Sequence, residues 1–345
     1  MRASCGSRHW LLCYRRYCVS PTGVGYRFLG LWWDHLGAVS RCAIFNLNKR
    51  ATRSPSDRAA GSTYRAFVAN CFFTGEQWSP TIGGARILNK ITLKLGRYHI
   101  EIVRNPENFS LSPSDARGGF HHTCDILVHG VTATTLQRAK ALVNEIAELL
   151  SFATMSQVAP FGSEFSGSIS RQSVRGLTLY FRPAIEQRGT ELRRFLEQTW
   201  PHYHRLRLRR KLHIVFDYLV TSCTPEQPLE VKLLLSFVAL ESLKSTYARC
   251  AGYTFIKSRW RRNQTSAGFE TLVREMIGQF NMRRSLAAII KLRNQIVHHG
   301  MSRRPFNSQE TTHFDTMDLI REYLLRLLQF KGAYWDYHLN ARQIV

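Results

Sequence analysis

The spacing of apolar residues changes along this chain of 345 residues, and that change constrains the fold more than any other feature. Apolar and polar residues alternate over residues 91–102 on either side of Gly96-Arg97, which predicts a β-hairpin. Beyond residue 188 the apolar residues recur at the spacing of amphipathic helices. We therefore expect an α+β protein, with a mixed α/β domain over residues 63–187 followed by an all-α domain over residues 188–345. A chain of this length can hold two domains that each bury a core.

The first domain contains further strand candidates at residues 125–131 and 177–181. Between them, residues 136–150 carry the apolar spacing of a helix, and Thr134 is of a residue type that commonly caps helices. Nothing in this domain points to a particular chemistry. It could sense another molecule, dock a partner or position a nucleic acid, and its sequence does not choose between these roles.

Potential metal ligands are scattered along the chain. His121-His122 and Cys124 are close in sequence, but adjacent histidines point apart on any regular element, so we interpret the histidines as a surface pair. The eight cysteines form no Cys-x-x-Cys and no zinc spacing, which is typical of reduced thiols in a cytoplasmic protein. We expect no metal and no cofactor. No apolar run approaches the roughly 18 residues that a membrane span needs, so no membrane partner is expected.

The chain is strongly basic, with 48 basic and 24 acidic residues and a formal net charge of +24. An excess of this size favours a polyanionic partner such as RNA, although a solvated basic surface is the alternative. A helix predicted over residues 204–223 opens with a basic run, and Tyr203 and His204 before it could stack on bases. A solvated helix face would explain the run equally well. The candidate RNA-binding residues are Arg205, Arg207, Arg209, Arg210 and Lys211.

Residues 1–62 differ from the rest, because they are rich in Arg and Cys, poor in acids and lack sustained periodicity. Three hypotheses remain open: a transit peptide, a nucleic-acid-binding arm, or an extension that results from a misplaced start codon. We favour an unstructured extension, joined by a linker over residues 51–62.

The stretch from Lys291 to Gly300 holds the strongest candidate site. It follows a full apolar stripe over residues 269–280 and lies in a second predicted helix, which Gly300 ends. Asn294 and His298 are four residues apart and share a face. Arg293 and His298 are five residues apart, which separates them by about 140° around a helix. One straight helix cannot aim both at one phosphate, so a frayed last turn or a second copy of the helix is needed.

The pattern Arg-Asn-x-x-x-His, with an apolar pair before the His and a Gly soon after it, resembles the RNase motif of the HEPN superfamily, closest to its Apea-like branch. Residues 233–243 are similar to the Ala-Leu-Glu helix that precedes the motif in that branch, and residues 319–330 match its closing helix. The likeness spans roughly residues 190–340. One departure is that Gly300 stands where the toxins paired with a nucleotidyltransferase antitoxin carry Tyr, so control by modification of that Tyr is not supported.

The resemblance implies a helical bundle that dimerises and cleaves RNA without metal, in phage defence or a toxin system. In such cleavage the ribose 2′-OH attacks the phosphate, and the products are a 2′,3′-cyclic phosphate and a 5′-OH end. His298 would be the acid or base, and Arg293 would stabilise charge on the phosphorane. Asn294 would orient His298 or hold a phosphate oxygen, His299 would supply a second proton-transfer group, and Glu241 would brace Arg293 or a helix end.

Two alternatives stand beside this hypothesis. Cations also favour a helix C-terminus because of its dipole, so Arg293 and His298 could be purely structural. The domain could equally be a non-catalytic RNA-binding or protein-interaction HEPN module. A homodimer interface could use an apolar face of the last helix, unless that face serves the core of its own chain; its members are Leu319, Ile320, Tyr323, Leu324, Leu327 and Leu328.

Overall fold

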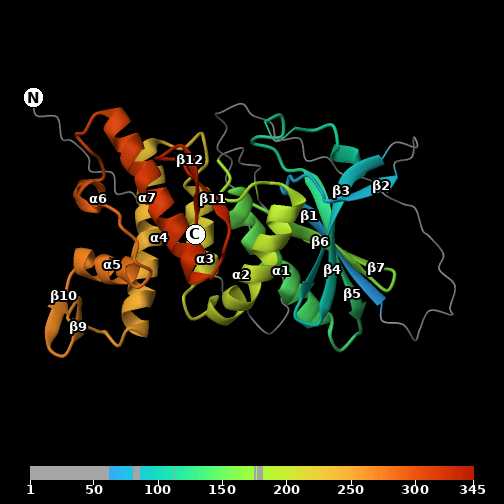
Figure 1. Ribbon diagram of the computed structural model, residues 1–345, viewed down its shortest axis with the longest axis horizontal. Helices are drawn as coiled ribbons and strands as arrows, with labels where there is room; N and C mark the ends of the chain where they lie inside the picture. Colours follow the sequence, from blue (N-terminus) through green and yellow to red (C-terminus); the bar gives the residue numbers. More distant parts are fainter. Residues whose placement is uncertain (1–61, 81–85, 113, 175, 177–181) are drawn as a thin grey trace, which may run out of the picture. The chain divides into compact units, whose positions relative to one another are not determined.

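The computed structural model describes residues 62–345, apart from 81–85, 113, 175 and 177–181 (Figure 1). The extension expected over residues 1–62 therefore lies outside the described residues, except for its last position, and so does the strand expected at 177–181. All of the described residues belong to one compact unit.

Within the described residues, seven strands form one sheet with the order β2-β3-β4-β5-β1-β6-β7, and every neighbouring pair is antiparallel. The hairpin predicted around Gly96 is confirmed: Leu95 pairs with Tyr98, and Gly96 has a φ of +57°, which glycine adopts without strain. The strands are β1 (Ser62–Ala69), β2 (Gln77–Pro80), β3 (Arg86–Leu95), β4 (Tyr98–Arg104), β5 (His122–Val131), β6 (Ala159–Phe165) and β7 (Ser168–Arg171). A short 3-10 turn, Pro106–Asn108, follows β4.

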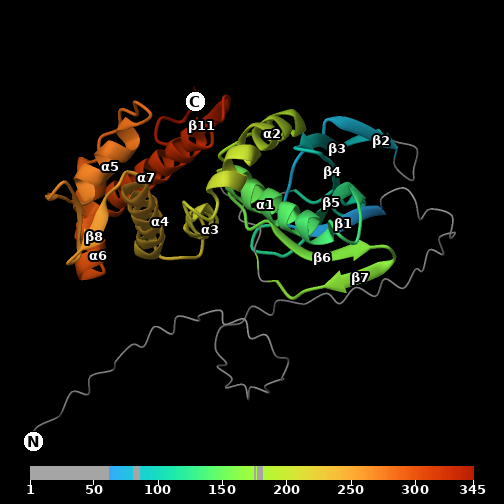
Figure 2. The ribbon, with the colours of Figure 1, turned by 90° about the horizontal axis from the view of Figure 1, so that it is seen from below.

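The two faces of the sheet differ because side chains alternate along each strand. Ile91, Ile100 and Ile126 are fully buried on one face. The predicted helix α1 (Leu136–Thr154) packs on the sheet through its own apolar side (Figures 1 and 2). The residues that alternate with these isoleucines along each strand are mostly polar and half-buried, and they line the other face.

Helices dominate the rest of the chain, so the predicted change from a sheet-rich to a helix-rich part is confirmed (Figure 1). The apolar core continues across residue 187: Phe152 of α1 stacks on Phe216 of α3, with ring centroids 4.8 Å apart. The two parts therefore share one core. The helices are α2 (Gly189–Leu206), α3 (Leu212–Thr221), α4 (Leu229–Cys250), α5 (Phe269–Gly278), α6 (Ala287–His299) and α7 (Phe306–Leu327).

The all-α prediction for residues 188–345 needs a correction, because this part also contains two small antiparallel sheets. Two-residue turns with positive φ at both positions, Lys257-Ser258 and Asn263-Gln264, join the strands of the larger one. Such turns match the twist of a hairpin. The side chain of Trp260, on the middle strand, is buried. The strands are β8 (Thr254–Ile256), β9 (Arg259–Arg262) and β10 (Thr265–Ala267) in one sheet, and β11 (Ala333–Asp336) and β12 (Ala341–Ile344) in the other.

The helix predicted over residues 204–223 is also wrong. Helix α2 continues to Leu206, the chain turns, and α3 starts at Leu212 after Lys211 takes a left-handed φ of 52°. The basic run therefore lies on a corner between two helices. In the part of the chain that the structure describes, we find no helix with the length and apolar character required to span a bilayer.

Candidate functional site

Helix α6 carries the Arg-Asn-x-x-x-His pattern. Ile289, Leu292 and Ile296 are buried on one side of this helix, at the spacing of an amphipathic helix, which leaves the motif residues on its other sides. The helix ends as predicted: Gly300 has a φ of +73°, and its N–H donates to the carbonyl of Ile296 at 2.9 Å. His298 therefore lies in the last regular turn of α6.

Arg293 is held by a carboxylate from another helix. Its Nη2 donates to Oε1 of Glu241 on α4 at 2.5 Å, and Lys244 Nζ lies 2.5 Å from the other oxygen of the same carboxylate. These side chains are largely shielded, with 18% of Arg293, 28% of Glu241 and 9% of Lys244 exposed. A carboxylate that holds two cations in partly buried surroundings fixes both of their positions.

An aromatic ring completes this cluster. Phe269, the first residue of α5, has the Arg293 guanidinium 4.8 Å and the Lys244 ammonium 5.4 Å from its ring centroid. Cations at this distance are attracted by the face of the ring. The Arg293–Glu241–Lys244–Phe269 group, which we call the α6 brace, thus joins α4, α5 and α6. The Nε of Arg293 is buried and has no hydrogen-bond partner among the described residues.

Asn294 and the two histidines lie outside the brace. The side-chain oxygen of Asn294 accepts a hydrogen bond from Nη1 of Arg293 at 2.9 Å, so this amide touches Arg293 and leaves its NH2 group available as a donor. His298 and His299 are exposed, and neither imidazole makes a hydrogen bond or ion pair with another described residue. The structure therefore brings Arg293, Asn294 and Glu241 together, but it does not bring His298 to them.

The regular geometry of α6 explains why Arg293 and His298 are apart. The helix is continuous from Ala287 to His299, so its last turn is not frayed. Five residues of an α-helix rotate the side-chain direction by about 140° and advance it by about 7.5 Å. Within one chain, Arg293 and His298 therefore face different sides of α6.

The basic run before α3 is used in two ways. Arg207 pairs with Glu148 of α1 at 2.5 Å, and this hydrogen bond raises the pKa of Arg207. Arg210 is buried and donates to the hydroxyl of Tyr323 at 2.7 Å. The prediction that all five residues contact RNA therefore needs correction for these two, which tie helices together. The remaining members, Arg205, Arg209 and Lys211, are exposed.

The structure also bears on two further expectations about binding. Tyr203 cannot stack on a base, because it is fully buried and its hydroxyl donates to Glu148 at 2.5 Å. His204 is exposed, although its ring stacks on Trp200 and its Nδ1 lies 2.9 Å from Glu145.

The apolar face of α7 belongs to the core of its own chain, since Leu319, Ile320, Tyr323, Leu324 and Leu328 are fully buried and Leu327 packs against the same core.

Other apolar side chains are exposed near the motif. Val297 on α6 is 42% exposed, Met301 just beyond the helix is 65% exposed, and Phe306 at the start of α7 is 62% exposed. Val297 is four residues from Arg293, so the two share a side of α6. These residues are candidates for a contact with a second copy.

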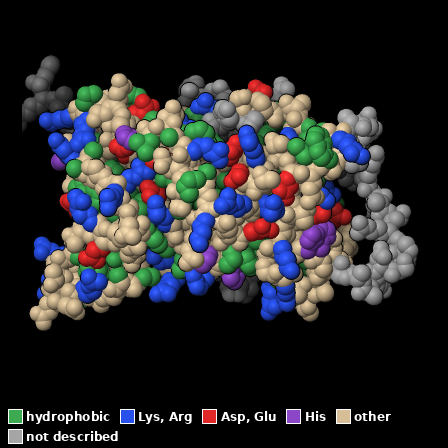
Figure 3. All heavy atoms as spheres, viewed as in Figure 1, with side chains coloured by type: hydrophobic (Ala, Val, Ile, Leu, Met, Phe, Trp, Pro, Cys, Tyr) green, Lys and Arg blue, Asp and Glu red, His purple; other side chains and the backbone are tan. Residues whose placement is uncertain are grey.

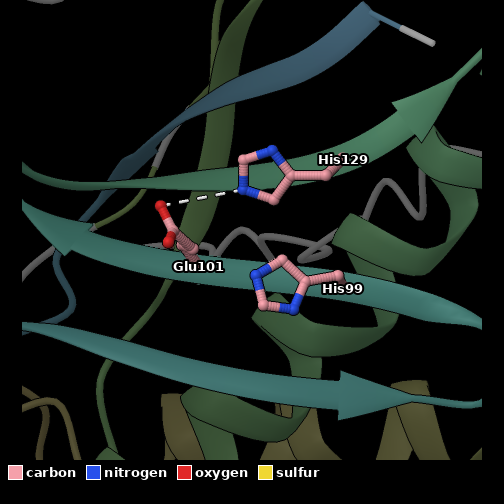
Figure 4. A group of neighbouring side chains, drawn as sticks. All are labelled: His99, Glu101 and His129. Carbon is pink, nitrogen blue, oxygen red and sulfur yellow. Dashed lines mark ion pairs between the residues drawn. The ribbon is translucent and has the colours of Figure 1, made fainter. Parts of the chain in front are cut away.

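A second group of chemically capable residues was not predicted from the sequence. His99 and Glu101 on β4 and His129 on β5 place their ligand atoms within 4.8 Å of one another (Figure 4). The pattern His-x-Glu on a strand was a signal that both side chains share a face, but the neighbouring strand that brings His129 could not be foreseen. His122, in contrast, pairs with Asp125 at 2.8 Å, and Cys124 is buried.

Comparison of the chain with protein-family models, with curated proteins and with solved structures found no match. The geometry of α6 and the resemblance of its motif are therefore the grounds on which a function is inferred.

Proposed function

We propose that this protein is a metal-independent endoribonuclease of HEPN type that cleaves RNA by attack of the 2′-OH. One observation carries the proposal: α6 presents an exposed His298, without a partner among the described residues, in its last turn, while Arg293 of the same motif is fixed by Glu241. A proton-transfer group must be free to meet its substrate, whereas an electrostatic stabiliser works best when it is held in place.

Each residue then has a distinct role. His298 transfers a proton to or from the reacting oxygens, and His299 beside it is available for a second transfer. Asn294 accepts from Arg293 and can donate its free NH2 to a phosphate oxygen. Arg293 contributes positive charge, which its contacts with Glu241 and Asn294 direct. Glu241 positions Arg293 and takes no part in proton transfer.

A second copy of the chain completes the proposed catalytic site. Because α6 is regular, a single helix keeps Arg293 and His298 about 140° apart. A two-fold axis beside the end of α6 would set His298 of one protomer opposite Arg293 and Asn294 of its partner, in a contact of the commonest oligomer type. The exposed side chains of Val297, Met301 and Phe306 supply apolar surface for that contact.

RNA would be attracted by the excess positive charge of the whole chain. Lys and Arg side chains are spread over the face shown in Figure 3, with acidic side chains between them, so this face has no single basic track. Arg205, Arg209 and Lys211 are the exposed members of the basic run, so they can contact phosphates. We further propose, from the resemblance alone, that the cleavage serves phage defence or a toxin system.

A specific observation favours a second candidate, a non-catalytic RNA-binding or protein-interaction module. Arg293 donates to Glu241 and to Asn294 and lies over Phe269, which are the contacts that a purely structural residue would make. In this case the brace would stabilise the helices, and His298 would be an ordinary surface residue.

One assay separates the two candidates. Purified full-length protein is incubated with RNA in EDTA, and the ends of the products are analysed. Cleavage to 2′,3′-cyclic phosphate ends that is lost in His298→Ala supports the enzyme, with His121→Gln on the sheet side as the matched control. A gel shift without cleavage supports the binding module, and cleavage unchanged in His298→Ala contradicts the proposed mechanism.

A further inference from the structure

Three ligand-type side chains meet on the sheet, in a part of the structure that the proposed ribonuclease does not use. Alternation along β4 puts His99 and Glu101 on the same face. Strands β4 and β5 pair Ile100 with Val128, so the next step of this antiparallel register sets His99 opposite His129. Figure 4 shows the two imidazoles and the carboxylate turned toward a common space.

The distances suit a metal ion after small side-chain movements. The three ligand atoms lie within 4.8 Å of one another. Ligands around a tetrahedral zinc ion, with bonds near 2.1 Å, are separated by about 3.4 Å. The difference, at most about 1.4 Å, is within the range of side-chain rotation, because His99 is exposed and the other two residues are half-buried. Among the described residues, this is the one group of three such side chains that converge so closely.

His129 is already oriented for coordination. Its Nδ1 lies 3.1 Å from the hydroxyl of Thr63, which leaves Nε2 directed at Glu101. The Nε2 atom is buried and has no hydrogen-bond partner among the described residues, since Glu101 Oε2 is 3.7 Å away. An unpaired buried nitrogen costs free energy, which a bound ion would remove. Histidine ligands commonly have such a polar partner on their second nitrogen.

Glu101 is held as a charged ligand. Lys90 Nζ donates to Oε1 at 3.0 Å, so Oε2 remains available on the side of His129. Burial alone would raise the pKa of Glu101, but the hydrogen bond and the charge of Lys90 lower it below its ordinary value. An ionised carboxylate beside two imidazoles is a donor set that suits divalent transition metals.

The surroundings also allow an ion to reach the group. His99 borders an open hollow of about 570 Å³, which it shares with Lys94 of β3 and Arg193 of α2. An ion pair between Glu101 and protonated histidines is the simpler explanation of the same geometry. That explanation leaves two imidazole rings, whose centroids are 5.2 Å apart, carrying like charge side by side.

We propose that His99, Glu101 and His129 bind one divalent transition-metal ion of the zinc class. Two imidazoles and one carboxylate provide three protein ligands, so a coordination position is left for water or another small ligand. Thr63 orients His129 and Lys90 orients Glu101 from outside the ligand set. The site does not depend on the proposed ribonuclease, whose cleavage is expected to persist in EDTA.

The test uses full-length protein that has been stripped with EDTA and titrated with ZnCl2 by calorimetry, with bound zinc measured after dialysis. Because the cysteines and other histidines can also bind zinc, the readout is the difference between variants. We expect His99→Gln, Glu101→Gln and His129→Gln each to remove one equivalent of zinc. Thr63→Val is expected to weaken the same equivalent about tenfold without removing it. MgCl2 should produce no binding at this group.

The matched control is His122→Gln, which removes a histidine of the same sheet that forms its ion pair with Asp125, away from the proposed ligands. It should keep the full zinc content. Circular dichroism of each stripped variant establishes that it is folded. No difference in zinc content between the wild type and His129→Gln would overturn the proposal. An equal loss in His122→Gln, or an unchanged affinity in Thr63→Val, would also count against it.

Discussion

Arg293 on α6 and Glu241 on α4, which are 52 residues apart in the sequence, are joined by a hydrogen bond of 2.5 Å. The carboxylate also holds Lys244, and both cations lie over Phe269. The arginine of the motif is therefore a member of the brace between three helices as well as a candidate for catalysis. Substitutions at Arg293 and His298 should consequently have different effects on stability.

Arg293→Ala should destabilise the protein as well as abolish cleavage. The substitution leaves one side of Glu241 without its partner and removes a cation from Phe269, so we expect a loss of about 1–3 kcal/mol in the free energy of unfolding. Urea denaturation measures it. Arg274→Ala is the matched control, because Arg274 forms an exposed pair with Glu270 and should cost about 0.5 kcal/mol or less. Equal stability of the Arg293→Ala variant and the wild type would show that the brace contributes nothing.

His298→Ala should abolish cleavage and leave stability unchanged within about 0.5 kcal/mol. The imidazole is exposed and has no hydrogen-bond or ion-pair partner among the described residues, so its removal breaks no such interaction. Single-turnover cleavage and thermal unfolding of the same preparation provide the two measurements. A variant that unfolds at a lower temperature would place His298 in the packing of the helix end.

Two adjacent arginines of the basic run offer a matched comparison. Arg210 is buried against Tyr323, whereas Arg209 is exposed. Arg210→Ala should lower the free energy of unfolding by about 1–3 kcal/mol. Arg209→Ala should leave it unchanged but weaken RNA binding, and the dependence of binding on salt should become less steep. Unfolding curves and filter binding at several salt concentrations distinguish these outcomes. The reverse pattern would contradict the assignment of the two side chains.

Local periodicity was enough to predict strands β3, β4 and β5 of the large sheet and several helices, but not the other four strands of that sheet. The hairpin around Gly96 and the helices α1, α5 and α6 are each specified by residues that are close together in the sequence. The position at which α6 ends was predicted from Gly300 alone. The strands β8–β12 were missed because each is three or four residues long, too short for alternation to be recognised.

Contacts between distant segments could not be predicted. Arg207 and Arg210 looked like their exposed neighbours in the sequence, since their partners Glu148 and Tyr323 are 59 and 113 residues away. The order of strands is equally a tertiary property, which is why His129 was not connected with His99. The motif on α6 was visible because all of its members lie on one helix.

Acid should destabilise the protein through His313. This side chain of α7 is 3% exposed, and burial, aided by the charges of Arg321 and Lys232, lowers its pKa to about 3. An unfolded histidine has a pKa near 6.5, so between about pH 6.5 and pH 3 the unfolded chain binds the extra proton. Stability therefore falls as the pH is lowered through this window, by up to about 1.4 kcal/mol per pH unit. Urea denaturation at pH 7, 6 and 5 of the wild type and of His313→Gln should show a smaller decline in the variant. An equal decline would assign the pH dependence to other groups.

Val297→Asp should convert the protein into a monomer and abolish RNA cleavage. Val297 is 42% exposed and shares a side of α6 with Arg293, so the proposed two-fold contact would bury it. A carboxylate there would be desolvated without a partner and repelled by its symmetry mate. The substitution should scarcely affect the folding of one chain. Ile169→Asp is the matched control, because Ile169 is an exposed apolar residue of β7 in the sheet. Light scattering at micromolar concentration gives the mass, and cleavage is measured on the same samples. A wild-type monomer that cleaves RNA would refute the two-chain site, and so would a monomeric Val297→Asp variant that retains full cleavage.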